Sequence, residues 1–276
     1  MLELEAITVR RLGVSGPAVH VLHGGPGAPG SARGVARVLS QRFTVFEPLQ
    51  RRAGSVPLSV EQHVRDLAAL APSPALLVGH SWGAMLGLSY ASRYPEAVSK
   101  LVLVGCGTYD EATRAQLRAA IQERLGPEGR ERVSQLSAQL VGETTAIQRE
   151  AALQQLASIH AELETYASVE SEIDTGTKPS EFLPLDPQGH SETWNDVIRR
   201  QRDGVEPQAF SQIRAPVLMI HGDYDPHPGP ATRDLLQQSI PQLEYLSLER
   251  CGHEPWREQY ARERFAEALR EWLERK

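Results

Sequence analysis

The sequence predicts an α/β fold with a mostly parallel central sheet, flanked by helices and interrupted by an inserted helical lid. Short apolar runs alternate with helical patterns in both outer parts of the chain, which predicts strands joined by crossover helices. Several of these runs, such as ALLV and LVLV, are apolar throughout, as strands buried on both faces are. About a hundred residues in the middle contain no convincing strand and are too many for one loop, which predicts the lid.

Composition is that of an ordinary globular protein. The 276 residues are 41% hydrophobic and 23% charged, and 29 basic against 35 acidic residues give a net charge of −6. No basic run indicates a nucleic-acid or membrane partner, and no apolar run approaches the ~18 residues that cross a bilayer. The N-terminus does not resemble a signal peptide, and two cysteines are too few for a disulfide framework. We therefore expect a soluble, cytoplasmic protein.

The outer parts of the chain supply the predicted core elements. Strands are expected at Leu2–Val9, Ala18–Leu22, Phe43–Phe46, Ala75–Val78, Leu101–Val104, Val217–Ile220 and Leu243–Leu248. One helix should begin at the capping-box pattern Ser59-Val-Glu-Gln62. Other helices are expected at Ser81–Tyr94, Pro230–Ile240 and Arg257–Leu273, the last with its apolar residues on one face.

The middle of the chain is rich in Gln, Glu, Arg and Ala. Apolar residues from Ile147 to Tyr166 recur at mostly three- to five-residue steps, which is typical of an amphipathic helix. A further helix is expected at Glu192–Arg202, after an irregular segment that contains three prolines. We therefore predict a core domain of residues 1–108 and 212–276, and a lid of residues 109–211.

The segment Gly79-His-Ser-Trp-Gly83 follows a predicted buried strand and opens a predicted helix. Gly-x-Ser-x-Gly in this context indicates a nucleophile elbow, a turn too tight for large side chains beside the serine. Ser81 would then stand exposed at the N-terminus of the helix, where developing negative charge is favoured. The alternative is a plain strand-to-helix turn. We expect Ser81 to be the nucleophile.

The glycine-rich turn His23-Gly-Gly-Pro-Gly27 directly follows the strand AVHVL. Such a turn leaves backbone N–H groups free to point at an oxyanion. By analogy with other nucleophile elbows, we expect the oxyanion donors to be the backbone N–H groups of Gly25 and Trp82. A phosphate-binding loop is the competing interpretation, but no Gly-Lys-Ser/Thr follows and the glycine spacing does not fit.

A nucleophilic serine needs a base, and the base needs an orienting carboxylate. His253 lies in Cys-Gly-His-Glu-Pro after the last predicted strand, which makes it the favoured base; the alternatives are His80, His221 and His227. Asp225 follows the penultimate strand in His221-Gly-Asp-Tyr-Asp225 and is the favoured acid; Asp223 is second and Asp110 third. The chain order Ser, Asp, His is the hydrolase order.

Metal and cofactor binding are not expected. His221, Asp223, Asp225 and His227 could be drawn as a metal cluster, but they lie in one short segment and no second ligand set is evident. A non-catalytic binding protein on the same fold would lack a member of the triad, and all three members are present here. We therefore expect an enzyme that needs no cofactor.

Together, these motifs resemble the α/β-hydrolase superfamily, and HGGPG with GHSWG is most similar to the proline iminopeptidase group of serine hydrolases. In that group the acid follows a HGxxD strand end and the base lies in a GHxP-like loop, so the resemblance implies Asp225 and His253. Gln50-Arg-Arg-Ala-Gly-Ser55 is similar to the group's DQRGxGxS segment, from which Arg52 and Ala53 depart. His80 replaces the more usual glycine, and the group's lid signature Trp-x-x-Trp-Glu is absent.

The resemblance implies cleavage of a small amide, such as an N-terminal proline of a short peptide. Esterase, lactonase or carbon–carbon bond hydrolase activity could use the same triad. An iminopeptidase must pair the charged amine of its substrate, so acidic lid side chains should face the pocket. Glu192, beside Trp194, is the first choice; the other candidates are Glu162, Glu164, Glu170 and Glu172.

Overall fold

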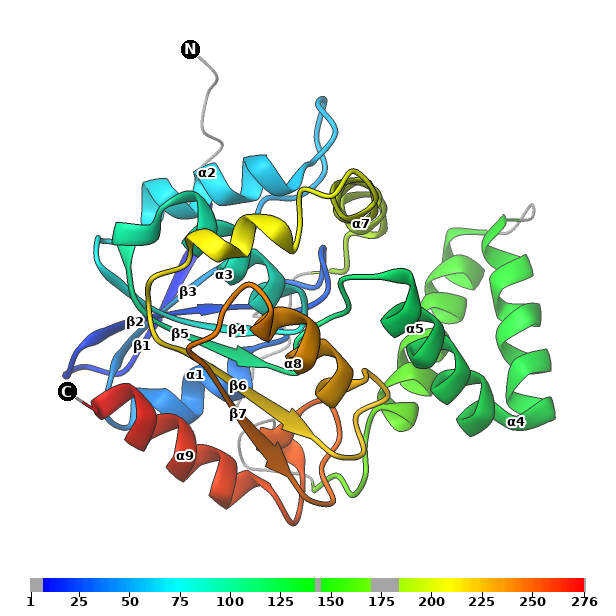
Figure 1. The fold of residues 1–276 in the computed structure, drawn as a ribbon. Helices are drawn as coiled ribbons and strands as arrows, with labels where there is room; N and C mark the ends of the chain where they lie inside the picture. The colour runs from blue at the N-terminus through cyan, green and yellow to red at the C-terminus, as the bar shows by residue number, and fades with distance from the viewer. Residues whose placement is uncertain (1–6, 142–144, 170–183, 276) are drawn as a thin grey trace.

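A seven-stranded sheet forms the centre of the computed structural model (Figure 1), which describes residues 7–141, 145–169 and 184–275. The strand order is β1-β3-β2-β4-β5-β6-β7. β1 pairs with β3 in antiparallel fashion, and the other neighbours are parallel. The strands are β1 (Val9–Leu12), β2 (Ala18–Leu22), β3 (Thr44–Pro48), β4 (Ala75–His80), β5 (Val98–Val104), β6 (Val217–Gly222) and β7 (Leu243–Leu248). β4 is therefore central, and the carboxyl ends of the parallel strands share one edge.

Helices cover both faces of this sheet (Figure 1). Alternate residues of a central strand enter different apolar clusters: Leu77 of β4 packs on one face and Val78 on the other. The helices on the Leu77 face are α2 (Val60–Leu70), α3 (Trp82–Arg93) and α8 (Gly229–Gln237), and those on the Val78 face are α1 (Arg33–Ser40) and α9 (Arg262–Glu274). Short 3-10 helices lie at Pro95–Ala97 (η1), Gln208–Gln212 (η3) and Pro255–Arg257 (η4). The predicted α/β fold is confirmed.

Within its described residues, the middle of the chain forms three longer helices: α4 (Glu111–Val141), α5 (Ala146–Leu163) and α7 (Pro187–Arg202). α4 is interrupted at Gly126, which has a positive φ of 61° and precedes a proline. α4 and α5 pack on each other as a hairpin that projects from the α/β body (Figure 1). At the base of this hairpin the guanidinium of Arg124 donates to the carbonyls of Leu163 and Tyr224. This helical insert is compatible with a lid; the domain limits at 108 and 212 stay a prediction.

Residues 164–169, which we call the return segment, lead away from α5 along the loop after β7. The carboxylate of Glu258 is buried and accepts hydrogen bonds from the backbone N–H groups of Tyr166 (2.9 Å), Ala167 (2.8 Å) and Gly252 (2.8 Å). The backbone N–H of His253 donates to the carbonyl of Glu164 at 2.8 Å. The helical insert is thereby fastened to the loop that carries His253.

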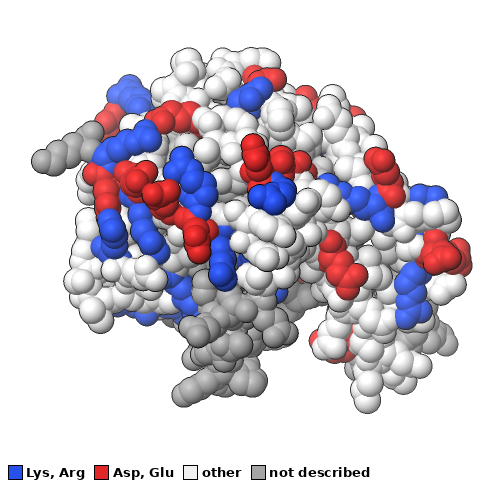
Figure 2. All heavy atoms as spheres, turned by 90° about the horizontal axis from the view of Figure 1, so that it is seen from below, with Lys and Arg blue, Asp and Glu red and all other residues white. Residues whose placement is uncertain are grey.

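Charged side chains of both signs intermingle on the face drawn in Figure 2. The ion pairs include Arg42 with Glu274 and Arg275 with Glu244, in which every side chain is at least 40% exposed. Among the described residues, no helix is long and apolar enough to span a bilayer.

The first strand was predicted too early. Within the described residues it covers Val9–Leu12 rather than Leu2–Val9, and the first part of the predicted range, residues 2–6, lies outside the described residues. β1 is an edge strand without a fully buried side chain, so apolar content did not mark it. Its Arg10 instead pairs with the buried carboxylate of Glu47 at 2.9 Å.

Helix ends also differ from the predictions. α7 begins at Pro187 rather than Glu192, α8 ends at Gln237 rather than Ile240, and α9 begins at Arg262 rather than Arg257. The first difference has a local cause, because the Asp186 side chain caps α7 by accepting from the backbone N–H of Gly189 at 3.0 Å.

Candidate active site

Ser81 lies on the sharp turn between β4 and α3. Its backbone angles are φ 54° and ψ −117°, a conformation that is unusual for a residue with a side chain. The turn requires its glycines: a Cβ on Gly79 would lie 2.2 Å from the carbonyl oxygen of Gly83, and a Cβ on Gly83 would lie 2.2 Å from that of Leu22. The Ser81 backbone N–H donates to the carbonyl of Val104 at 2.8 Å. The geometry is that of the predicted elbow.

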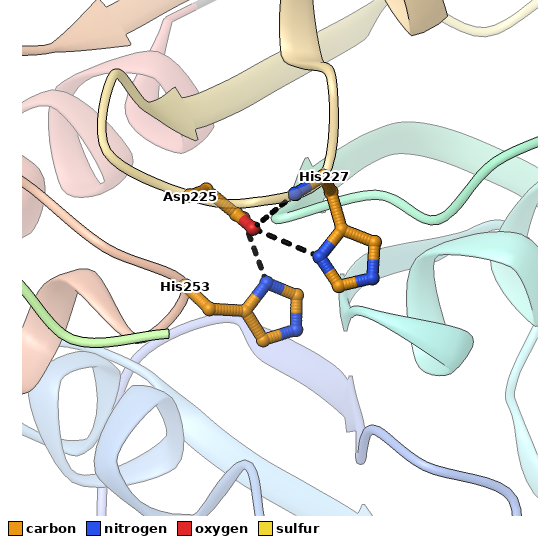
Figure 3. A group of neighbouring side chains, drawn as sticks. All are labelled: Asp225, His227 and His253. Carbon is orange, nitrogen blue, oxygen red and sulfur yellow. Dashed lines mark hydrogen bonds and ion pairs between the residues drawn. The ribbon is translucent and has the colours of Figure 1, made fainter. Parts of the chain in front are cut away.

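Asp225 and His253 come from the loops after β6 and β7, and the parallel strands bring them together (Figure 3). Nδ1 of His253 lies 2.7 Å from Oδ2 of Asp225, and both side chains are buried. Asp223 is exposed and accepts from the backbone N–H of Cys251 instead. Asp110 accepts from the backbone N–H of Thr113 at 2.7 Å, at the start of α4. Of the three predicted acids, Asp225 is the one that contacts His253.

The other candidate histidines surround this pair. His227 bonds to Oδ1 of Asp225 through its backbone N–H (2.9 Å) and its ring Nδ1 (2.8 Å). Nε2 of His221 lies 3.3 Å from Oδ2 of Asp225 and 3.0 Å from the carbonyl oxygen of His227. His80 contacts His253 ring to ring, and its Nε2 lies 3.1 Å from the carbonyl oxygen of His253. These three imidazoles therefore support the pair.

Electrostatics favour a charged carboxylate and a proton on His253. Burial lowers the pKa of His253, but the negative charge of Asp225, reinforced by Glu164 and Glu254, outweighs burial and raises this pKa to about 9. Burial likewise opposes the charge of Asp225, yet the neighbouring histidines hold the pKa of this carboxyl well below its usual range. Burial lowers the pKa of His80 well below its ordinary value. The charge of Asp225 thus favours a proton on His253.

A hydrogen-bond network braces the predicted oxyanion turn. Nε2 of His23 accepts from the backbone N–H of Gln50 at 3.1 Å, and the amide of Gln50 donates to the His23 carbonyl at 3.0 Å. The indole N–H of Trp82 donates to Oε1 of Gln50 at 2.7 Å. Gly25 has a positive φ of 39°, and Trp82 is the first residue of α3, where backbone N–H groups lack helical acceptors. Gln50 therefore links the start of the turn that carries Gly25 to the side chain of Trp82, a role that its sequence position did not reveal.

A cavity of about 310 Å³ opens above the elbow. Five predicted site residues line it: Gly25, Ser81, Trp82, Trp194 and His253. Its lining also includes two carboxylate residues and three further histidines: Glu164, Glu254, His80, His190 and His227. Burial raises the pKa of Glu254, although Arg257, at 2.9 Å, acts in the opposite direction. Two acidic side chains therefore border the cavity that contains the serine.

Glu192, the preferred amine-binding candidate, does not line this cavity. Its Oε2 accepts from the backbone N–H of Leu58 at 2.9 Å, and its Oε1 accepts from the side chain of Gln188. These bonds give Glu192 a structural contact between α7 and the segment before α2. Among the other candidates, Glu164 lines the cavity and Glu162 is exposed; Glu170 and Glu172 lie outside the described residues.

Among the described residues, one group of side chains is placed to hold a metal ion: Asp225, His227 and His253. Their nitrogen and oxygen atoms already bond to one another at 2.7 and 2.8 Å (Figure 3). These are hydrogen-bond lengths, and a metal would have to displace the hydrogens from both rings. The absence of a metal requirement stays a prediction.

Comparison with known proteins identifies the family. The family model described as alpha/beta hydrolase fold matches residues 58–256, which contain the elbow, Asp225 and His253. The chain belongs to the alpha/beta hydrolase family. The matched range also spans the helical insert, so this alpha/beta hydrolase carries its insert within the family's own region.

Individual relatives of this alpha/beta hydrolase are distant. An uncharacterised protein of Mycobacterium tuberculosis is 32% identical over 106 residues, which are 35% of this chain and 31% of that protein. A probable aminopeptidase of Bacillus subtilis is 29% identical over 110 residues, covering 33% of this chain and 35% of the relative. Each match thus spans about a third of the curated relative. A thermophilic esterase from Thermogutta terrifontis has the same fold, with a TM-score of 0.61 and 21% identity over 97% of this chain and 92% of that one.

Proposed function

We propose that this alpha/beta hydrolase is a serine hydrolase that works through an acyl-enzyme. The observation that carries the proposal is that Ser81 and His253 line one cavity while Asp225 bonds to His253 at 2.7 Å. The serine has the strained elbow backbone, and the imidazole has the orienting carboxylate on the nitrogen that faces away from the reaction. Nucleophile, base and orienting group are the three parts that covalent acyl transfer requires.

In the proposed mechanism, Oγ of Ser81 attacks the carbonyl carbon of the substrate while Nε2 of His253 takes the hydroxyl proton. The backbone N–H groups of Gly25 and Trp82 stabilise the oxyanion that forms. His253 then gives its proton to the leaving group, and the bond between that group and the carbonyl breaks. Water, activated by the same imidazole, hydrolyses the acyl-serine. Asp225 keeps the tautomer and stabilises the imidazolium.

The proposed substrate class is a small amide with a free amine next to the scissile carbonyl, such as an N-terminal proline residue. Glu164 and Glu254 support this choice, because both line the cavity and a charged amine needs an acidic partner when it is buried. The similarity to a probable aminopeptidase of Bacillus subtilis points the same way. The second candidate is an ester or lactone, favoured by the shared fold with the Thermogutta terrifontis esterase.

A fluorophosphonate probe and a chromogenic ester test the hydrolase proposal. The unmutated protein should be labelled at Ser81 and should hydrolyse the ester. Ser81→Ala should abolish labelling and lower turnover by about six orders of magnitude, because the triad acts as a unit. Labelling at another residue, or ester turnover that survives in Ser81→Ala, would contradict the proposal.

A panel of proline anilide, alanine anilide and short acyl esters tests the substrate class. We expect the proline anilide to be the best substrate, and Glu164→Gln to raise its KM about tenfold by removing one charged hydrogen-bond partner. KM for a neutral ester should stay unchanged in that variant. Glu162→Gln is the matched control, because Glu162 is exposed and outside the cavity. An unmutated enzyme that cleaves esters and no anilide would establish the second candidate.

A further inference from the structure

Asp225 holds two imidazoles instead of one (Figure 3). Its Oδ2 lies 2.7 Å from Nδ1 of His253, and its Oδ1 lies 2.8 Å from Nδ1 of His227. An ionised carboxylate only accepts hydrogen bonds, so Nδ1 of each ring carries a hydrogen. Both rings therefore have the same tautomer, with Nε2 left over on the side away from the carboxylate.

The two rings also lie against each other. Their centroids are 4.5 Å apart and their planes differ by 19°, which is a stacked arrangement. Both line the cavity with Ser81, and the His227 side chain is 14% exposed. The His227 backbone N–H donates to the same Oδ1 at 2.9 Å. Oδ1 of Asp225 thus accepts two hydrogen bonds from His227, and Oδ2 accepts one from His253.

We propose that His227 is a positioning residue of the active site: its ring N–H holds Oδ1 of Asp225, so that Oδ2 stays aimed at His253, and it draws part of the carboxylate's charge away from His253. The inference rests on the proposed hydrolase function. It assigns a role to a residue that neither the elbow nor the triad requires, and His227 acts through Asp225 rather than on the substrate.

Two consequences follow from one carboxylate serving two donors. Loss of the His227 ring would leave Oδ1 of Asp225 held by the His227 backbone N–H alone, which would loosen the orientation of the carboxylate and of His253. Loss of the ring would also remove one donor that shares the negative charge of Asp225 with His253. The proton on His253 would then be held more tightly, and His253 would become neutral, and able to act as a base, only at higher pH. A residue that merely filled space beside Asp225 would affect stability but would not move the pH dependence.

Other ionisable groups face the two rings and stay in place when His227 is replaced. They come from β4, β6, the return segment and the His253 loop itself: His80, His221, Glu164 and Glu254. Glu164 and Glu254 stabilise a proton on His253, whereas a proton on His80 or His221 would oppose it. A change that appears only when His227 is altered therefore reports on the shared carboxylate.

The rate of Ser81 labelling by a fluorophosphonate, measured across pH, tests the inference without knowledge of the substrate. His227→Leu removes the ring donor, whereas His227→Asn keeps an N–H at the same number of bonds from the backbone as Nδ1. In His227→Leu we expect the labelling rate to fall about 10- to 100-fold, the typical worth of a hydrogen bond to a charged group. The midpoint of its pH dependence should rise by about half a unit to one unit.

In His227→Asn the labelling rate and the midpoint of its pH dependence should both return to near the values of the unmutated protein. His190→Leu is the matched control, because His190 lines the same cavity but bonds to the carbonyl of Pro26 and not to Asp225; its midpoint should not move. An unchanged rate and midpoint in His227→Leu would overturn the inference, as would an Asn variant no better than the Leu variant. Failure of the proposed function would appear differently, as absence of Ser81 labelling in the unmutated protein.

Discussion

Asp225 shows how much chemistry can depend on one side chain, because its carboxylate accepts hydrogen bonds from two imidazoles and one backbone N–H, and a third imidazole, that of His221, lies 3.3 Å away. The sequence identified Asp225, Ser81 and His253 as candidates because each follows a strand in a recognisable motif. It did not reveal that His227 shares the carboxylate or that Gln50 connects His23 to the side chain of Trp82. These contacts join loops far apart in the chain, and no local pattern encodes a pairing between distant loops.

The pH dependence of activity is a prediction at this scale. In the proposed mechanism His253 must be neutral to accept the serine proton, and the charge of Asp225 raises the pKa of His253 to about 9. Ester turnover at low substrate concentration should therefore rise with pH, with a midpoint above the ordinary histidine value of 6.5. Asp225→Asn should lower this midpoint and cost several orders of magnitude in kcat, whereas Asp223→Asn, an exposed control, should change neither. A rate that is flat from pH 5 to pH 9 would argue against His253 as the base.

The elements of the core were largely predictable, because buried parallel strands are apolar on both faces and stand out in the sequence. The predictions were wrong for elements that are not held mainly by the burial of apolar side chains. β1 is an edge strand held by backbone pairing and by the Arg10–Glu47 ion pair, and its burial pattern has no fully buried position. α1 was not predicted, since its eight residues form too short a window for a periodic pattern.

The turn between β4 and α3 gives a stability prediction. A Cβ at Gly83 would lie 2.2 Å from the carbonyl oxygen of Leu22, so Gly83→Ala must push α3 away from β2. We expect Gly83→Ala to lower the free energy of unfolding by about 2 kcal/mol or more, measured by urea denaturation. Gly54→Ala is the control, because a Cβ there meets no atom within 4 Å and should leave stability unchanged or slightly higher. Equal stability of the two variants would contradict the steric argument.

Several histidines are packed inside the molecule as neutral side chains, and this affects the protein as a whole. Burial lowers the pKa of both His23 and His63 to about 4. In the unfolded chain these groups take up protons below about 6.5, whereas in the folded protein they resist protonation until about pH 4. The unfolded state therefore binds more protons in that window, and folding stability is lost as the pH falls through it.

We expect the free energy of unfolding to decrease steadily between about pH 6.5 and pH 4, by up to about 3 kcal/mol for each of these two histidines. Urea denaturation at a series of pH values measures this slope. His63→Gln should make the slope shallower, although its hydrogen bond to Thr193 makes the variant less stable at neutral pH. His160→Gln, on the exposed surface of α5, should leave the slope unaltered. A slope that is the same in all three proteins would mean that His63 does not contribute.

The return segment is held by its main chain: the contacts with Glu258 and His253 use the N–H groups of Tyr166 and Ala167 and the carbonyl of Glu164. Main-chain bonds do not depend on which side chain a position carries. The residue at position 164, which lines the cavity, can therefore be exchanged without shifting the imidazole that it flanks. Under the proposed function, substrate preference would then change at position 164 while the backbone that holds His253 stays in place, although loss of the Glu164 charge would lower the pKa of His253.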